Sequence, residues 1–161
     1  MVTGHGEGGR PALAREAREL IESASRGVLS TLDPEGGFPH ASIIDVAPVA
    51  GSDLVTLLSR LAVHRKYAEA DARASILIAP YLGEDDAMMR PRVTLVGRLV
   101  QEDDRSLYRG DYLAAHPEAE MYLTLPDFDF FRLHTERARY IAGFGRMGWL
   151  DGQDLRGGDN G

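Results

Sequence analysis

The spacing of apolar positions changes along the chain from a helical period to an alternating one. Over residues 11–25 apolar side chains recur every three or four positions, which is typical of an amphipathic helix. Pro11 suits the first turn of this helix, because its missing N–H would have no partner there. Beyond residue 26, short β-branched runs alternate with polar residues. The pattern therefore predicts one N-terminal helix followed by a series of strands.

The strands expected from these runs are joined mainly by short turns. They cover residues 27–32, 40–48, 53–59, 74–80, 92–101, 127–135 and 137–144, and helical patterns cover 60–73, 103–116 and 117–124. The turn formers "DPEGGFP" predict a hairpin between the first two strands, a tight turn joins the last two, and Gly97 is a candidate β-bulge. Strands and helices do not alternate regularly, so the order favours a mainly β fold, an antiparallel barrel or curved sheet with short helices.

With 161 residues, the chain is long enough for one domain, which we expect over residues 11–150. Residues 1–10 are rich in glycine and predict a disordered segment. Residues 151–161 have no apolar periodicity and predict a flexible tail.

Charge and composition narrow the classes of function. The formal net charge is −7 and the pI is about 5.2, which disfavours binding to nucleic acid or to membrane surfaces. The chain has no cysteine, so thiolate chemistry and disulfides are excluded, and its five histidines show no zinc-site spacing, so we expect no metal. No apolar run is long enough for a membrane helix, and no signal peptide is visible, which predicts a cytoplasmic protein.

Gly143, Gly145 and Gly148 have the G-x-G-x-x-G spacing of a dinucleotide-binding loop. That spacing binds a pyrophosphate only where a helix follows it. Residues 149–161 contain four glycines and predict no helix, so we expect the motif to be the exit from a final strand. Arg146 and Trp149 within it either support that strand end or line a ligand or subunit interface.

The second predicted helix carries its charges in an unusual order. Arg60, Arg65 and Lys66 lie in its first two turns, where the helix macrodipole disfavours cations unless an anion binds. Ser59 in the N-cap position and His64 add further hydrogen-bond donors, so the segment predicts a phosphate site.

The alternative is an exposed helix in which Arg65 pairs with Glu69 at i,i+4. Arg92 shares a strand face with Thr94 and Val96, and it joins the phosphate site if that strand crosses near the start of the helix.

Several stretches in order along residues 12–150 carry a family resemblance. "GVLSTLDPEGGFPHASIIDVAP", "LLSRLAVHRKYAEADARASILI", "PRVTLVGRLV", "YLAAHPEAEMYL", "DFDFFRL" and "GFGRMGWL" resemble the pyridoxamine 5'-phosphate oxidase-like FMN-binding split barrels, and most closely the HugZ-type haem-utilisation branch. The resemblance implies a six-stranded antiparallel split β-barrel that forms a homodimer and holds FMN at the subunit interface.

Matching the family's flavin-binding positions one by one implies a set of cofactor-binding residues in this chain. They are Ser42, Ile43, Ile44, Ser59, His64, Arg65, Lys66 and Arg92. No residue stands out as catalytic, as expected where the flavin carries the reactivity. The implied function is that of an FMN-dependent oxidoreductase acting on a small-molecule substrate that the sequence does not identify.

Two departures from the family keep other functions open. His40 and Asp45 stand on the second strand where the oxidase proper has an Arg and a Lys, which disfavours pyridoxamine phosphate oxidation. Haem-degrading members use a histidine near or beyond the end of the barrel, whereas the last histidine here is His134. The alternatives are therefore a haem-binding or haem-degrading protein, with haem held by another residue, and a cofactor-free regulatory dimer.

Overall fold

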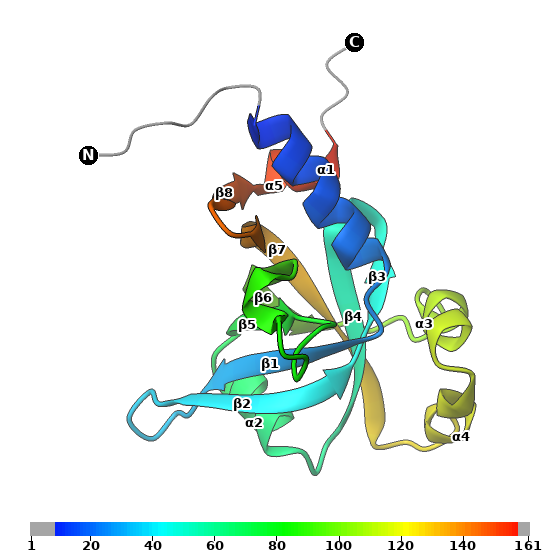
Figure 1. The fold of residues 1–161 in the computed structure, drawn as a ribbon. Helices are drawn as coiled ribbons and strands as arrows, with labels where there is room; N and C mark the ends of the chain where they lie inside the picture. The colour runs from blue at the N-terminus through cyan, green and yellow to red at the C-terminus, as the bar shows by residue number, and fades with distance from the viewer. Residues whose placement is uncertain (1–8, 158–161) are drawn as a thin grey trace.

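An antiparallel sheet of eight strands forms the body of the computed structural model, which describes residues 9–157 (Figure 1). The strands are β1 (Arg26–Leu32), β2 (Pro39–Asp45), β3 (Ala47–Val49), β4 (Asp53–Ser59), β5 (Arg73–Ile78), β6 (Arg92–Gln101), β7 (Phe128–Gly143) and β8 (Arg146–Asp151). Their order is β2-β1-β5-β6-β7-β4-β3, with β8 paired to β7. The mainly β class and the split barrel are confirmed, with eight strands in place of six.

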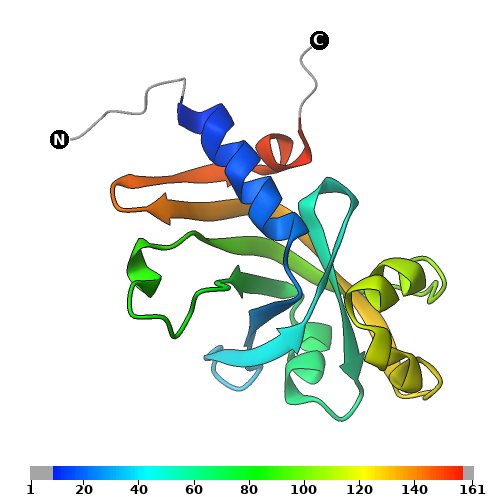
Figure 2. The ribbon, with the colours of Figure 1, turned by 45° about the vertical axis from the view of Figure 1, so that its right-hand side comes forward.

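Helices cover the open ends and edges of this curled sheet. They are α1 (Gly9–Glu22), α2 (Val63–Ala70), α3 (Arg109–Ala115), α4 (Glu120–Leu123) and α5 (Gly152–Arg156), with 3-10 turns at η1 (Ala50–Ser52), η2 (Ala87–Met89) and η3 (Pro117–Ala119). The predicted helix over 11–25 is confirmed with shifted ends. Its buried face, with Ala14, Ala17 and Ile21, lies on the sheet near β7 and β8 (Figure 2).

Alternation along the strands separates an inner face from an outer face. Leu29, Ile76, Leu95 and Leu133 are almost completely buried and fill the main core together with residues of α1. A second, smaller core lies where α3 and α4 cover β4 and the start of β7, and Phe130 is at its centre. The two cores explain why β4 is buried on both faces.

The strand predicted over 40–48 is two strands. Val46 is fully buried and its amide donates to Ser25 O, which separates β2 from β3. β2 and β3 then pair at opposite ends of the strand order. Apolar alternation continues through this corner, so the pattern alone does not show it.

The two strands predicted over 127–135 and 137–144 are one strand, β7, and the expected tight turn between them is wrong. Thr135 pairs with Gly97 and Arg137 with Val96, which leaves Glu136 as the extra residue of a bulge. A Cβ on Gly97 would lie 2.0 Å from His134 O, so only glycine allows this close approach. The bulge predicted at Gly97 is confirmed.

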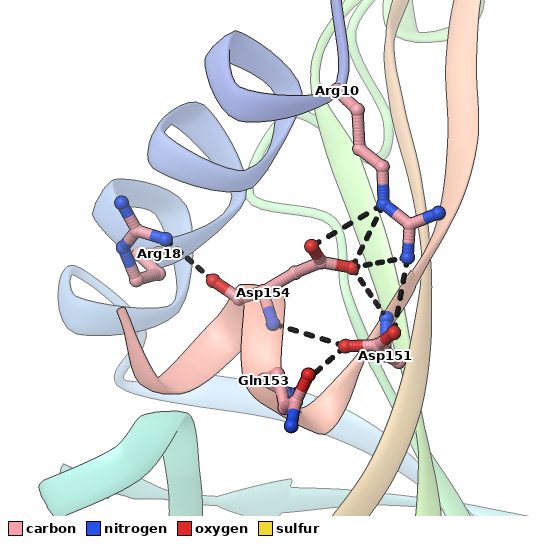
Figure 3. Close-up of polar contacts among 5 residues, drawn as sticks. All are labelled: Arg10, Arg18, Asp151, Gln153 and Asp154. Carbon is pink, nitrogen blue, oxygen red and sulfur yellow. Dashed lines mark hydrogen bonds and ion pairs between the residues drawn. The ribbon is translucent and has the colours of Figure 1, made fainter. Parts of the chain in front are cut away.

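The C-terminal residues were predicted to lack regular structure, and this is wrong for residues 151–157. Asp151 caps α5 in a capping box with Asp154, and Leu155 is buried. Arg10 at the start of α1 donates to both carboxylates, and Arg18 donates to Asp154 O (Figure 3). Ion pairs and a helix cap stabilise this segment. Such contacts produce no apolar periodicity in the sequence, so the pattern did not predict the helix. Residues 1–8 and 158–161, part of the segments predicted to be disordered or flexible, lie outside the described residues.

Candidate functional site

One row of side chains crosses six strands on the outer face of the sheet. Residues directly opposite each other in antiparallel strands share a face. The registers link in turn Ile43, Val28, Leu77, Thr94, Arg139 and Trp149. We call this set the outer row.

The outer row exposes apolar surface that a single chain leaves uncovered. Ile43 is 74% exposed and Trp149 49% exposed, and the neighbouring Met147 on β8 is 41% exposed. Val28 and Leu77 between them are half-buried. Exposed apolar side chains gathered on one face are typical of surfaces that bind a partner or a ligand.

Two arginines add positive charge at the Trp149 end of the row. The Arg137 guanidinium carbon lies 4.7 Å from the centroid of the Trp149 ring, and that of Arg139 lies 5.9 Å from it. Within residues 9–157 neither arginine makes an ion pair. Both therefore keep hydrogen-bond donors available for an anionic group.

Sequence reasoning missed Arg137 and Arg139, although a signal was present. In "RARYIA" they alternate with Ala138 and Tyr140, which are buried, so a period of two already places both arginines on one face.

The glycine motif closes the hairpin between β7 and β8. Gly143 pairs with Arg146, and both Gly143 and Gly145 have positive φ, which favours glycine in a two-residue turn. A strand follows this turn, so the exclusion of a dinucleotide loop is confirmed, although the expected lack of a helix beyond it is wrong. The two readings of Arg146 and Trp149 separate: Arg146 donates to Glu16 of α1 at 2.8 Å, and Trp149 belongs to the outer row.

The eight residues implied to bind FMN lie on both faces of the sheet. Ile43 and Arg92 are on the outer face, where Arg92 donates to Met88 O at 3.0 Å. Ser42 and Ile44 alternate with Ile43 and face inward. Thus the second-strand residues do not point to one common side.

The positions around α2 also differ from the expected phosphate cradle. The helix begins at Val63 with Ala62 as its N-cap, so Ser59 is not the cap. Ser59 Oγ accepts from Leu61 N and donates to Asp127 at 3.3 Å. Lys66 is exposed in the first turn.

Arg65 is a buried structural residue. Its guanidinium lies 2.9 Å from Asp129 and 2.9 Å from Glu69, and it donates to Leu58 O. Burial lowers the pKa of Arg65, but the hydrogen bonds with the two carboxylates outweigh it, so the pKa is raised overall. The i,i+4 pair with Glu69 that the sequence offered as an alternative is confirmed, and the arginine faces protein acceptors.

His64 lies beside His40 of β2. Burial lowers the pKa of His64, and the nearby charge of His40 lowers it further. The His40 ring meets Tyr67 of α2 edge-on, with centroids 5.6 Å apart. His40 and Tyr67 therefore form a contact between α2 and the β1–β2 hairpin.

The curled antiparallel sheet and its edge helices define a split-barrel protein. Residues 10–155 match the family described as CREG, beta-barrel, and the chain belongs to that family.

Two similar proteins are named for haem. The chain is 33% identical over 147 residues to the chloroplastic heme oxygenase HOZ of Arabidopsis thaliana, covering 89% of this chain and 44% of HOZ. It is 33% identical to a solved heme binding protein from Mycobacterium smegmatis, with a TM-score of 0.81 over 89% of this chain and 60% of that chain. The chain thus spans less than two thirds of either protein.

A third similar structure shows the fold alone. A putative pyridoxamine 5'-phosphate oxidase from Listeria innocua is 19% identical, with a TM-score of 0.65 over 80% of this chain and 98% of that chain. The resemblance to the split-barrel fold and to its haem-related branch is confirmed. Among residues 9–157, every helix is too short or too polar to cross a membrane.

Proposed function

We propose that this chain binds haem on its outer row and does so as a homodimer. The observation that carries the choice of haem is the 33% identity, over 89% of this chain, to two proteins named for haem. The outer row supports the proposal, because it offers the two features that a flat, apolar macrocycle with carboxylate substituents requires. These are exposed apolar side chains, and two arginines that form no ion pair among the described residues.

The residues that would hold haem fall into two groups by chemistry. Trp149 and the neighbouring Met147 would pack against the macrocycle, and Arg137 and Arg139 would bind the carboxylates. When bound, haem supplies redox and oxygen chemistry through its iron.

His134 is a candidate iron ligand on the same face. It pairs with Arg98, which follows Thr94 and Val96 on the outer side of β6, and its side chain is about half exposed. Imidazole is a common axial ligand of haem iron. The haem-degrading activity suggested by HOZ would require this site to admit a small oxidant.

The second candidate is the FMN-dependent oxidoreductase implied by the resemblance. One observation favours it: the first turn of α2 holds His64, Arg65 and Lys66 and no acidic residue. Against it, Arg65 is committed to Asp129 and Glu69, and Arg92 donates to backbone carbonyls. Only Lys66, which is exposed, and His64, which is partly buried, remain on α2 to bind a phosphate.

The exposed apolar side chains of the outer row also support the proposed homodimer. A second copy laid on the outer row would cover Ile43 and Met147 and would enclose a ligand bound between the two sheets. Sedimentation equilibrium measures this directly. We expect a dimer, and Thr94→Arg at the middle of the row is expected to give monomers.

Absorption titrations of the purified protein with haemin and with FMN separate the candidates. Haem binding predicts a sharpened Soret band with saturable binding and no change in the FMN spectrum. Saturable FMN binding without haem binding supports the oxidoreductase, and binding of neither supports the cofactor-free dimer. Each of these two results contradicts the proposal.

A further inference from the structure

Two segments of the chain bring three side chains with metal-ligating atoms close together. Asp45 ends β2, His116 is the C-cap of α3, and Glu118 lies in η3. One ligand atom from each residue lies within 4.8 Å of the other two. Asp45 is far in sequence from His116 and Glu118, so the fold brings the β2 carboxylate to the other two groups.

His116 is buried, and its ring is held in one tautomer. His116 is 5% exposed, and its Nε2 lies 2.8 Å from Val46 O. A carbonyl oxygen only accepts, so Nε2 carries the proton and donates it. The neutral ring then keeps a lone pair on Nδ1.

Nδ1 faces the two carboxylates without a hydrogen bond to them. It lies 3.6 Å from Glu118 Oε1, which is longer than a hydrogen bond, and no other described residue bonds to it. A histidine whose far nitrogen donates to a backbone carbonyl while the near one faces acidic groups has the arrangement of a metal ligand.

The surroundings hold the other groups in place. Thr56 Oγ1 donates to Asp45 O at 2.8 Å, and the Tyr112 ring lies 5.0 Å from that of His116. Arg26 Nε donates to Asp45 Oδ1 at 3.1 Å, which leaves Oδ2 for another partner. Arg26 is therefore a competitor for the same carboxylate.

We propose that Asp45, His116 and Glu118 form a site for a divalent transition-metal ion, with Zn²⁺ as the best match. One imidazole nitrogen and two carboxylate oxygens are ligands that Zn²⁺ accepts, and three protein ligands leave a fourth position for water. The exposed Glu118 places that position toward solvent. The ion would connect the β2–β3 corner to the α3–α4 segment, independently of any haem on the outer row.

Calorimetric titration of the haem-free protein with Zn²⁺, and the visible d–d spectrum after adding Co²⁺, test this site. Glu118→Gln and Asp45→Asn each remove one ligand charge, and Glu120→Gln is the matched control two residues along the chain. We expect one saturable site, about tenfold or more weaker in either ligand variant and unchanged in the control. Arg26→Ala frees Asp45 and is expected to tighten binding.

Far-UV circular dichroism confirms that each variant is folded. The proposal is overturned if the wild type binds no Zn²⁺ saturably. It is equally overturned if both ligand variants bind Zn²⁺ as tightly as the wild type, because the ion would then sit elsewhere.

Discussion

Arg65 Nη1 lies 2.9 Å from Asp129 Oδ2, and the two side chains are 4% and 10% exposed. The guanidinium also lies 5.1 Å from the centroid of the Phe131 ring. This pair joins α2 to the start of β7 inside the barrel. The sequence suggested the cation-rich start of α2 as a phosphate site. Its central arginine, Arg65, instead binds a carboxylate of the same chain and has a structural role.

Replacing Arg65 with Met is expected to destabilise the protein by about 3–5 kcal/mol, because Asp129 is then left buried without its main partner. Urea unfolding measures the change. The control, Arg73→Met, removes an arginine from an exposed pair with Asp71 and is expected to have little effect. An Arg65→Met variant as stable as the wild type, but unable to bind FMN, would contradict the structural role and restore the phosphate site.

Acid is expected to weaken the fold through His64. Its pKa is lowered in the folded state, so between the two pKa values the unfolded chain binds more protons. Stability is therefore fully present above the unfolded value of about 6.5 and falls as the pH drops through the lower folded value.

Melting temperatures of the wild type and of His64→Gln, compared between pH 7.5 and pH 5, check this. The variant is expected to lose part of the acid dependence, whereas His134→Gln on the outer face keeps it. An equal acid dependence in the wild type and His64→Gln contradicts the assignment.

Leu155 is expected to contribute to stability although it lies after the last strand. It is 1% exposed and packs into the main core. Leu155→Ala is expected to cost about 2–5 kcal/mol in the free energy of unfolding. Gln153→Ala, on the exposed side of the same helix, is the control, and equal stability of the two variants would show that α5 does not stabilise the barrel.

Gly97→Ala is expected to be among the most damaging single-methyl changes in the chain. The new Cβ would meet His134 O at 2.0 Å, so β6 and β7 must separate at the bulge. We expect a loss of about 1–3 kcal/mol or more. Gly110→Ala in α3 places its Cβ in open space and is expected to be neutral or slightly stabilising, and thermal unfolding of both variants distinguishes the outcomes.

Most strands of the barrel were predictable because they are short β-branched runs bounded by turn formers, although β8 was not predicted and β4 is buried on both faces. The prediction for β6 over 92–101 matches the structure at both ends, and β4 over 53–59 does as well. Apolar alternation predicts the wrong strand ends in two places. At Glu136 a polar residue interrupts a continuous strand, and at Val46 a buried corner between two strands keeps the alternation. In both places a contact between distant strands decides the local structure.

The candidate site was harder to predict than the fold. The outer row becomes visible only when the registers of five strand pairs are known, because its members are spread from Val28 to Trp149. Likewise, nothing in the sequence shows that Asp129 lies beside Arg65. The charge pattern of a helix cannot distinguish a bound anion from a buried carboxylate of the same chain.

The haemin affinity of the double variant Arg137→Ala/Arg139→Ala shows most directly whether haem binds on the outer row. Arg15→Ala/Arg109→Ala removes two exposed arginines from helices α1 and α3 and is the matched control. Binding on the outer row predicts a Kd at least about tenfold weaker in the first variant, as expected for the loss of charge-assisted hydrogen bonds, and an unchanged Kd in the second. Equal haemin affinity in the wild type and in both variants would contradict the account.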